Sequence, residues 1–356
     1  MRVGIPRALI YYNYYPFWFG FFKALGIEIV LSDKTTKQTM SNGSSLVVTE
    51  TCLPIKVYVG HVLNLLDKGV DKIFVPSIQS VAHKIYNCSK IRALPDLIRN
   101  VVKREFTLIE ATLDKSEREQ GLPEFLKDIA VKFGIKDEQK VLDAQNYAWK
   151  VFNNYQTMTK AGVHFEKALR AAINGNIIIP STEKEYEVSI ALISHGYNIY
   201  DDRVSMKIFD KLDKLGVKVY TYEQLTQEQL VEGYTTLGVE KAYWANESEM
   251  TGAAGHYLRN SKIDGLITIT AFGCGPDSIM VDRIFRNAKK FEKPVLGLTL
   301  DEHTGEAGFI TRIEAFIDML LRKKRVMGVS DSKIEKSLEC EEIAIKRPNF
   351  ENIPIV

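Results

Sequence analysis

Short strand-like segments alternate with helical segments in both halves of this chain, and this alternation constrains the fold more than any other feature. Apolar, β-rich segments separated by helices of about ten to fifteen residues are typical of a parallel sheet with helices on its faces. The sequence therefore predicts an α/β fold. The expected strands are residues 2–5, 27–32, 45–50, 71–78 and 106–112 in the first half, and 187–195, 217–223, 241–246, 264–272 and 294–302 in the second.

Length and one charged helical region predict how the chain divides into domains. The 356 residues are more than one hydrophobic core usually serves, so two domains are expected. Residues 114–180 are charged, helical in period and poor in strand signals, and we interpret them as a helical linking region. We predict an N-terminal doubly wound, Rossmann-like or flavodoxin-like domain at 1–113 and a second one at 181–329. A C-terminal tail at 330–356 is expected to pack back on the body.

Composition and charge argue against several classes of protein. The 47 Lys and Arg residues nearly balance the 45 Asp and Glu residues, so the concentrated basic face of a nucleic-acid-binding protein is not expected. The apolar start of the chain has few early cations and is interrupted by Pro6 and Pro16, which argues against a signal peptide. No other stretch approaches the length of a membrane-spanning helix. We expect a cytoplasmic protein with no nucleic-acid and no membrane partner.

Three of the four cysteines are expected where ligands gather in α/β proteins. In open parallel sheets, ligands bind beyond the carboxyl ends of the strands. Cys52, Cys88 and Cys274 follow expected strands, whereas Cys340 lies in the tail. The cysteines form no C-x-x-C pair, which argues against a local zinc knuckle or a dithiol motif. Their wide spacing leaves two interpretations: inert buried thiols, or ligands that the fold brings together.

Cys52 and Cys274 share a local pattern, since each stands two residues before a proline that opens an expected helix. Pro is tolerated there because its missing N–H would be unpaired anyway. Each cysteine then lies just outside a helix N-terminus, where free N–H groups and the helix dipole favour a metal-binding thiolate. The alternative is an incidental cysteine at a loop-to-helix transition. Gly273 and Gly275 would let backbone approach a bound group, and Phe272 is expected to keep water away.

Three thiolates from remote loops suit either zinc or an iron–sulfur cluster, and their spacing alone does not choose between them. Structural zinc sites are usually four-coordinate and built from close ligand pairs. A 4Fe–4S cluster accepts cysteines from widely separated loops, because each cysteine binds a different iron. With three cysteine ligands, the fourth iron would be open to water, a serine, a substrate oxygen or a bridging group.

Three further residues are candidates for proton transfer. His195 follows the first expected strand of the second domain, and Glu302 and His303 come at the end of its last one. All three are therefore expected near the crevice at the carboxyl edge of the sheet. A carboxylate–histidine pair suits proton transfer. The alternatives are a surface histidine for His195, and helix capping by Thr304 and Glu306 in the later segment.

Four segments carry a resemblance to a known family: MRVGIPRALIYYNYYPFW, TETCLPIKVYVGHVLNL, AFGCGPDSIM and LDEHTGEAGFITRIEAF. In this order they resemble the acyl-CoA dehydratase activase-related proteins, relatives of the cluster-binding subunits of 2-hydroxyacyl-CoA dehydratases and of the double-cubane cluster proteins. The resemblance implies two Rossmann-like domains and three cysteines that hold a 4Fe–4S cluster in the cleft. By motif these cysteines are Cys52, Cys88 and Cys274, with Ser89 standing where the relatives often have proline.

The resemblance also implies reductive chemistry on an acyl-CoA or another small substrate, with low-potential electrons from an ATP-dependent activator or another donor. The chain has too few cysteines for a double cubane and no GxxxxGK[ST] loop, so it is not expected to be the ATPase itself. Three functions stay open. They are an oxygen-sensitive dehydratase-like or reductase-like enzyme, a non-catalytic electron-transfer or cluster-carrying subunit of a larger redox assembly, and a metal-free α/β binding protein. A homodimer and a heterodimer are both compatible with the sequence.

Overall fold

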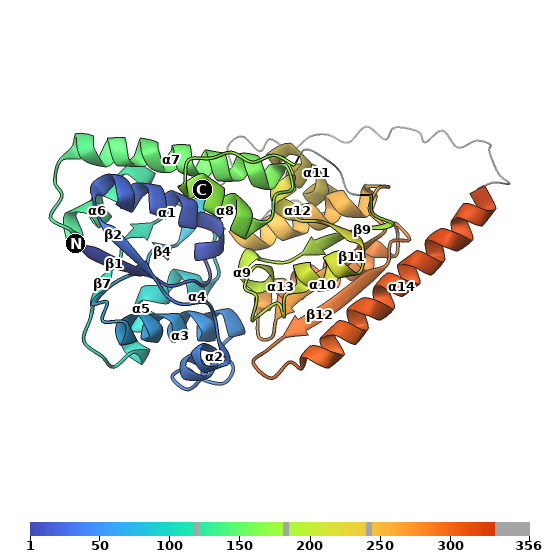
Figure 1. The fold of residues 1–356 in the computed structure, drawn as a ribbon, viewed down its shortest axis with the longest axis horizontal. Coiled ribbons are helices and arrows are strands. Elements are labelled where there is room, and N and C mark those ends of the chain that lie inside the picture. Colours follow the sequence, from blue (N-terminus) through green and yellow to red (C-terminus); the bar gives the residue numbers. More distant parts are fainter. Residues whose placement is uncertain (117–120, 181–184, 240–243, 332–356) are drawn as a thin grey trace.

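Two four-stranded parallel sheets form the frame of the molecule, one in each half of the chain (Figure 1). The computed structural model describes residues 1–116, 121–180, 185–239 and 244–331. Counted along each half, both sheets have the strand order 2-1-3-4, which is that of a doubly wound fold. The predicted class, a pair of doubly wound α/β domains, is confirmed.

The N-terminal sheet consists of β2 (Glu28–Leu31), β1 (Arg2–Ile5), β3 (Lys72–Phe74) and β7 (Thr107–Ile109), in that order. All of its pairs are parallel, with Val3 opposite Ile29 and Ile73 opposite Leu108. The short strands β4 (Ser77–Ile78) and β8 (Thr112–Leu113) prolong the pair formed by β3 and β7. The carboxyl ends of these strands face the second domain (Figure 1).

Helices cover both faces of the N-terminal sheet. One face carries α1 (Tyr11–Leu25), and the other carries α3 (Leu53–Asp67) and α5 (Leu94–Val101) (Figure 1). The helix α2 (Lys37–Ser44) packs closely on α3, since a Cβ added at Gly43 would lie 1.8 Å from the carbonyl oxygen of Lys56. A hairpin of β5 (Ser80–Ala82) and β6 (Ile85–Tyr86) leads to the short helix α4 (Ser89–Arg92).

The region predicted as a helical link forms three helices: α6 (Leu122–Lys132), α7 (Glu138–Lys160) and α8 (Phe165–Ile173). The long helix α7 packs along α1. The two helices lie close together at Gly20, where an added Cβ would lie 2.6 Å from the Cα of Ala148. These helices therefore form an outer layer on the N-terminal sheet. The boundaries of the predicted linking region, residues 114–180, stay a prediction.

The C-terminal sheet has the order β10 (Val217–Tyr220), β9 (Val188–Ile193), β11 (Gly265–Ala271) and β12 (Val295–Leu300). It is parallel throughout, with Ile190 opposite Val219 and Ile269 opposite Leu298. Its connections contain the helices α9 (Gly196–Ile199), α10 (Ile208–Lys214), α11 (Gln227–Thr236), α12 (Ala245–Arg259) and α13 (Gly275–Ala288), and the 3-10 turn η1 (Tyr222–Gln224). The helix α14 (Glu306–Asp331) follows β12.

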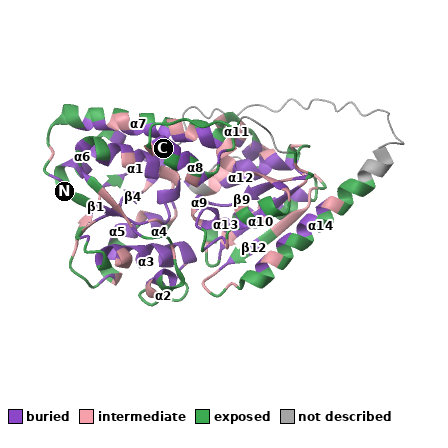
Figure 2. Cartoon of the chain, viewed as in Figure 1, coloured by how far each residue is buried: buried purple, intermediate pink, exposed green. Residues whose placement is uncertain are grey.

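Buried apolar side chains fill the space between each sheet and its helices (Figure 2). Phe22 and Ile73 are fully buried in the N-terminal half, and Ile190 and Ile267 in the C-terminal half. Burial of such a side chain contributes about 1.5–3 kcal/mol. One cluster of buried residues continues from the first domain into the second. The two domains therefore pack against each other through a shared apolar core.

The strand predicted at residues 45–50 is wrong. In the structure these residues form a turn-rich loop between α2 and α3, and Leu46 and Val48 are 39% and 71% exposed. A run of Leu and Val favours a strand only where a partner strand and a buried face are available, and this segment has neither. Cys52 therefore follows a loop and not a strand.

Two other predicted features lie partly outside the described residues. In the expected strand 241–246, residues 241–243 are outside, Trp244 forms an isolated parallel bridge with Tyr86, and Ala245 begins α12. Residues 332–356 of the predicted tail are also outside. None of the helices in the described ranges combines the length and the apolar character needed to cross a bilayer.

Candidate functional site

Cys52, Cys88 and Cys274 each occupy the residue immediately before a helix, at the N-termini of α3, α4 and α13. The backbone is extended at all three residues, with φ of −64°, −61° and −86°. Proline stands in the first turn of α3 and α13, as the C-x-P pattern predicts, and α4 begins with Ser89 instead. First-turn N–H groups approach all three sulfurs and favour their thiolate forms.

The loops that contain Cys52 and Cys274 touch across the domain interface. Gly273 has a positive φ of 77°, and a Cβ there would lie 3.2 Å from the carbonyl oxygen of Glu50 and 3.8 Å from the Cα of Cys52. Cys88 belongs to the same group, because its charge acts on Cys52, and all three thiols act on the hydroxyl of Tyr197. The structure thus brings the three predicted cysteines together. We call this group the cysteine site.

All three thiols are free and half-buried. Burial raises the pKa of Cys52 and of Cys88, whereas the ammonium group of Lys90 partly opposes this rise. Burial and the nearby carboxylate of Asp277 raise the pKa of Cys274 well above its ordinary value. The three groups are therefore neutral thiols at neutral pH, and binding of a metal to them would release protons.

His195 and Asp277 form a hydrogen-bonded pair beside the cysteines, with 2.7 Å between Nε2 and Oδ1. Both side chains are almost fully buried, at 7% and 1% exposure. Burial lowers the pKa of His195, but the charge and the hydrogen bond of Asp277 outweigh burial and raise it above the ordinary value. The other carboxylate oxygen, Oδ2 of Asp277, is buried without a hydrogen-bond partner. The carboxylate of Asp277 therefore holds the imidazole of His195, and it also interacts with the thiol of Cys274.

Glu302 lies at the same interface and contacts the first helix of the site. Its Oε1 is 2.5 Å from Nζ of Lys56 on α3, with side-chain exposures of 19% and 4%. Burial raises the pKa of Glu302, but the hydrogen bond from Lys56 outweighs burial and holds the pKa below its ordinary range. His303 is exposed, and its backbone N–H donates to Oδ1 of Asp301 at 2.9 Å. A proton-transfer role for Glu302 and His303 stays a prediction.

The residues that flank Cys274 leave space on one side of it. A Cβ added at Gly275 would meet no atom within 4 Å. The prediction that Phe272 keeps water away from the site is wrong, because its side chain is 64% exposed. Successive residues of an extended chain point to opposite sides, and here Ala271 takes the buried side at the end of β11.

Three free thiols from neighbouring helix N-termini are ligands of the kind that zinc or an iron–sulfur cluster takes. Within the described part of the chain, no three His, Cys, Asp or Glu side chains surround a position for one ion. Cysteines that bind different irons of a cluster stand farther apart than the ligands of one tetrahedral zinc. The space at Gly275 and the first-turn N–H groups at each sulfur also fit a bound group with thiolate ligands.

Sequence reasoning missed three charged residues of the site: Lys56, Lys90 and Asp277. Each stands two to four residues after one of the three cysteines, within or next to the first turn of the following helix. Side chains in a first turn lie close to the residue that precedes the helix, so this short spacing was a usable signal.

Residues 2–225 match the model of a protein family described as CoA enzyme activase uncharacterised domain. The match runs from β1 into the C-terminal sheet, and it includes Cys52, Cys88 and His195 but not Cys274. A search of the curated proteins found no match. Because the matched residues make up more than half of the chain, and in agreement with the resemblance to acyl-CoA dehydratase activase-related proteins, the chain belongs to this CoA enzyme activase family.

Proposed function

We propose that Cys52, Cys88 and Cys274 hold one 4Fe–4S cluster between the domains, and that it serves reductive chemistry on an acyl-CoA or another small substrate. The observation that supports this most is the convergence of three free thiols from two domains at three helix N-termini. Buried thiolates repel one another, so their ionised forms need a cationic centre among them. The narrower relationship to cluster-binding dehydratase subunits is part of this proposal.

When bound, such a cluster would supply low-potential electrons and an iron that no cysteine ligates. The chain's own residues would stabilise the negative charge of the thiolates. Lys90 lowers the pKa of both Cys52 and Cys88, and the N–H groups of Ile55 and Ile91 act in the same direction. Groups that surround the ligands in this way orient them and tune the metal site.

His195 is the residue best placed to hold a proton beside the site. Asp277 holds the imidazole of His195 through a hydrogen bond at Nε2. The imidazole ring stacks on the ring of Tyr197, with 5.0 Å between the two centroids. The raised pKa keeps a larger share of the imidazole protonated near neutral pH than in a free histidine. We assign the proton-transfer role to His195. Glu302 then acts through Lys56 on the position of α3, and His303 stands in solvent.

Membership of the CoA enzyme activase family supports a working relationship with enzymes that act on CoA thioesters. The chain contains no GxxxxGK[ST] loop, so we assign ATP hydrolysis to a separate activator. That activator, or another low-potential donor, is the proposed source of electrons. The thioester substrate follows from the family relationship alone.

Exposed apolar side chains beside Cys274 favour a second candidate, a subunit that passes electrons within a larger assembly. Phe272 and Ile279 flank the start of α13 and are 64% and 54% exposed. Apolar groups that stand together on a surface often mark a protein–protein contact. This candidate uses the same cluster but needs no substrate of its own.

Anaerobic purification followed by reconstitution with iron and sulfide tests the cluster. We expect about four irons and about four sulfides per chain, with an EPR signal after reduction. A chain that stays free of iron would contradict both candidate functions. Addition of acyl-CoA thioesters to the reduced protein then separates the two candidates. A changed EPR spectrum indicates an enzyme, and no response to any thioester favours an electron carrier.

A further inference from the structure

A cavity lies between the two domains, and none of the three cysteines lines it. It has a volume of about 200 Å³ and is lined by residues of α1, α8 and the loops after β2 and α9. We call it the tyrosine cavity, because Tyr11, Tyr12, Tyr15 and Tyr200 form its wall together with Phe165. Pockets for drug-sized molecules usually measure about 300–1,000 Å³. The tyrosine cavity therefore fits a compact molecule and not a whole coenzyme A thioester.

The aromatic rings that line this cavity pack against one another. Tyr11 and Tyr15 lie 4.8 Å apart between ring centroids, and Phe165 stacks on Tyr200 at 5.0 Å. All of these side chains are buried. A wall of rings offers a flat apolar surface, on which the apolar or aromatic body of a small ligand would pack.

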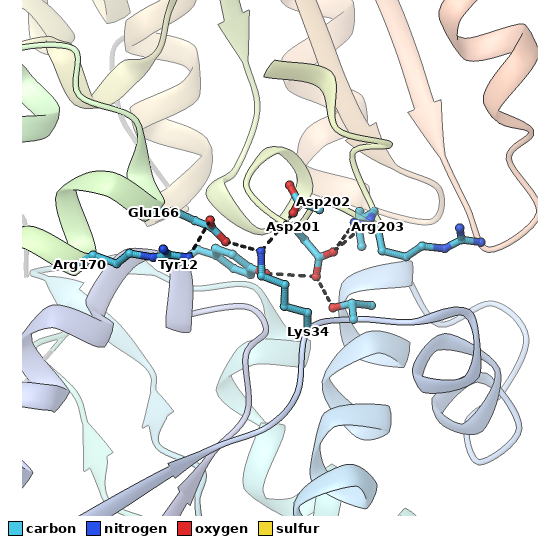
Figure 3. Close-up of polar contacts among 9 residues, drawn as sticks. Tyr12, Lys34, Glu166, Arg170, Asp201, Asp202 and Arg203 are labelled. Carbon is cyan, nitrogen blue, oxygen red and sulfur yellow. Dashed lines mark hydrogen bonds and ion pairs between the residues drawn. The ribbon is translucent and has the colours of Figure 1, made fainter. Parts of the chain in front are cut away.

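The carboxylates around the cavity already have partners (Figure 3). Asp201 is buried and accepts hydrogen bonds from the hydroxyl of Tyr12 at 3.1 Å, from Thr35, and from the backbone N–H of Arg203 at 2.9 Å. Figure 3 shows Lys34 between the two other carboxylates, and its Nζ lies 2.7 Å from Glu166 and 3.2 Å from Asp202. A cationic ligand would have to displace these donors.

Arg7 lines the cavity, and its Nε is a buried donor without an acceptor among the described residues. It follows β1 at the carboxyl edge of the N-terminal sheet, where ligands bind in α/β folds. Its backbone N–H donates to Oγ of Ser32 at 2.8 Å, which fixes the loop. Within the described part of the chain, its guanidinium group has no hydrogen bond or ion pair. A buried N–H donor without an acceptor is costly, so a ligand with an acceptor oxygen would be favoured there, and the positive charge of the half-buried Arg7 favours an anion.

We propose that the tyrosine cavity binds a small organic carboxylate, with the carboxylate on Arg7 and the apolar body on the tyrosine rings. A guanidinium group offers two parallel N–H donors to the two oxygens of a carboxylate. A dianion such as phosphate would also meet the negative charges of Asp201, Asp202 and Glu166, whereas a monocarboxylate meets less repulsion. This binding does not depend on the proposed cluster, so the two can be tested separately.

Calorimetric titration of the full chain under anaerobic conditions tests the site with three probes. Phenylacetate presents a carboxylate and a ring, phenylacetamide has the same shape without the charge, and inorganic phosphate has charge without a ring. We expect phenylacetate to bind at one site per chain and phenylacetamide to bind about tenfold more weakly or worse, because the charged hydrogen bonds are lost. Equal affinity for the two would overturn the role of Arg7. Tighter binding of phosphate would overturn the carboxylate assignment.

Variants of two arginines locate the site. Arg7→Gln should weaken phenylacetate binding about tenfold or more and leave phenylacetamide binding unchanged. Arg2→Gln is the matched control, since Arg2 lies on β1, the strand that leads to Arg7, and donates to the carbonyl oxygen of Gly69 at 3.0 Å on the surface. Wild-type affinity in Arg7→Gln would overturn the proposal. If that variant does not fold, Arg7→Lys keeps the charge, and loss of about threefold or more is expected, with wild-type affinity contradicting a guanidinium-specific contact.

Discussion

Lys56 and Glu302 form an ion pair, 2.5 Å between Nζ and Oε1, that joins α3 of the N-terminal domain to the loop after β12 of the C-terminal domain. Lys56 also donates to the carbonyl oxygen of Thr49 at 2.9 Å, in the loop before Cys52. One buried cation therefore holds both the loop that leads to Cys52 and the facing domain. The position of the first cysteine is coupled to the contact between the domains.

Replacement of Lys56 with Met should destabilise the protein, because Glu302 would keep a mostly buried charge without its partner. Breaking a buried pair from one side costs about 3–5 kcal/mol, and urea unfolding would measure the loss in free energy of unfolding. Lys127→Met is the matched control, since Lys127 pairs with Glu138 on the surface and its loss should cost about 1 kcal/mol or less. Equal losses in both variants would show that the Lys56 pair is no stronger than a surface pair.

Cys274→Ser should lose iron after anaerobic reconstitution, because one of three ligands would be replaced by a weaker one. Cys340→Ser, at a position outside the described residues, should retain the iron content and EPR signal of the wild type. Iron and sulfide assays on both variants measure the difference. If the two variants behave alike, Cys274 is not a ligand of the group.

Glu223 should make the protein less stable as the pH rises. Burial raises its pKa to about 7, although the hydroxyls of Tyr200 and Thr221 donate to it. Because the folded-state pKa exceeds the ordinary value of 4.5, the stabilising contribution is complete below pH 4.5 and is lost as the pH rises through 7. Glu223→Gln should therefore gain on the order of 2 kcal/mol over the wild type at pH 8, measured by urea unfolding.

The same comparison at pH 5 should show a much smaller gain for Glu223→Gln, since the wild-type carboxyl is then mostly protonated. Glu228→Gln serves as the control, because Glu228 is exposed and its pKa is lowered by the hydroxyl of Thr226, so it does not titrate between pH 5 and 8. A pH dependence that survives unchanged in Glu223→Gln would assign it to another group, of which Glu249, with a pKa also raised to about 7 by burial, is the first to examine.

Gly273→Ala and Gly275→Ala should differ in their effect on stability. Gly273 has a φ of 77° and an added Cβ would lie 3.2 Å from the carbonyl oxygen of Glu50, so this variant should lose about 1–2 kcal/mol. Gly275→Ala meets no atom and should unfold like the wild type without metal. If a cluster fills the space beside Gly275, this second variant should retain less iron. Wild-type stability in Gly273→Ala would contradict the close approach of the two loops.

Local patterns predicted the features that local forces determine. The alternation of strands and helices follows from hydrophobic periodicity, and it predicted both sheets. Pro54 and Pro276 marked helix starts correctly, because proline fits the first turn for a reason internal to the chain. The prediction of a strand at residues 45–50 was wrong because a strand requires a partner strand, and the sequence of the segment itself does not specify one.

Contacts between remote residues could not be predicted in the same way. His195 was expected at the sheet edge, but its partner Asp277 comes from another connection, and only the tertiary arrangement brings them within 2.7 Å. The tyrosines from Tyr11 to Tyr15 lie in the first turns of α1. That these rings line a cavity with Arg7 depends on how α8 and the second domain pack against α1.

The division of the cysteines between two domains has a consequence for biosynthesis. Cys52 and Cys88 emerge with the first sheet, whereas Cys274 follows β11 of the second. Domains usually fold as units, the N-terminal one first while the ribosome is still translating the rest. The complete set of three thiols therefore exists only after the second domain has docked on the first. A reagent that cross-links the three thiols would therefore react only with chains in which the two domains have docked. It would not cross-link all three thiols in a nascent chain that contains the first domain alone.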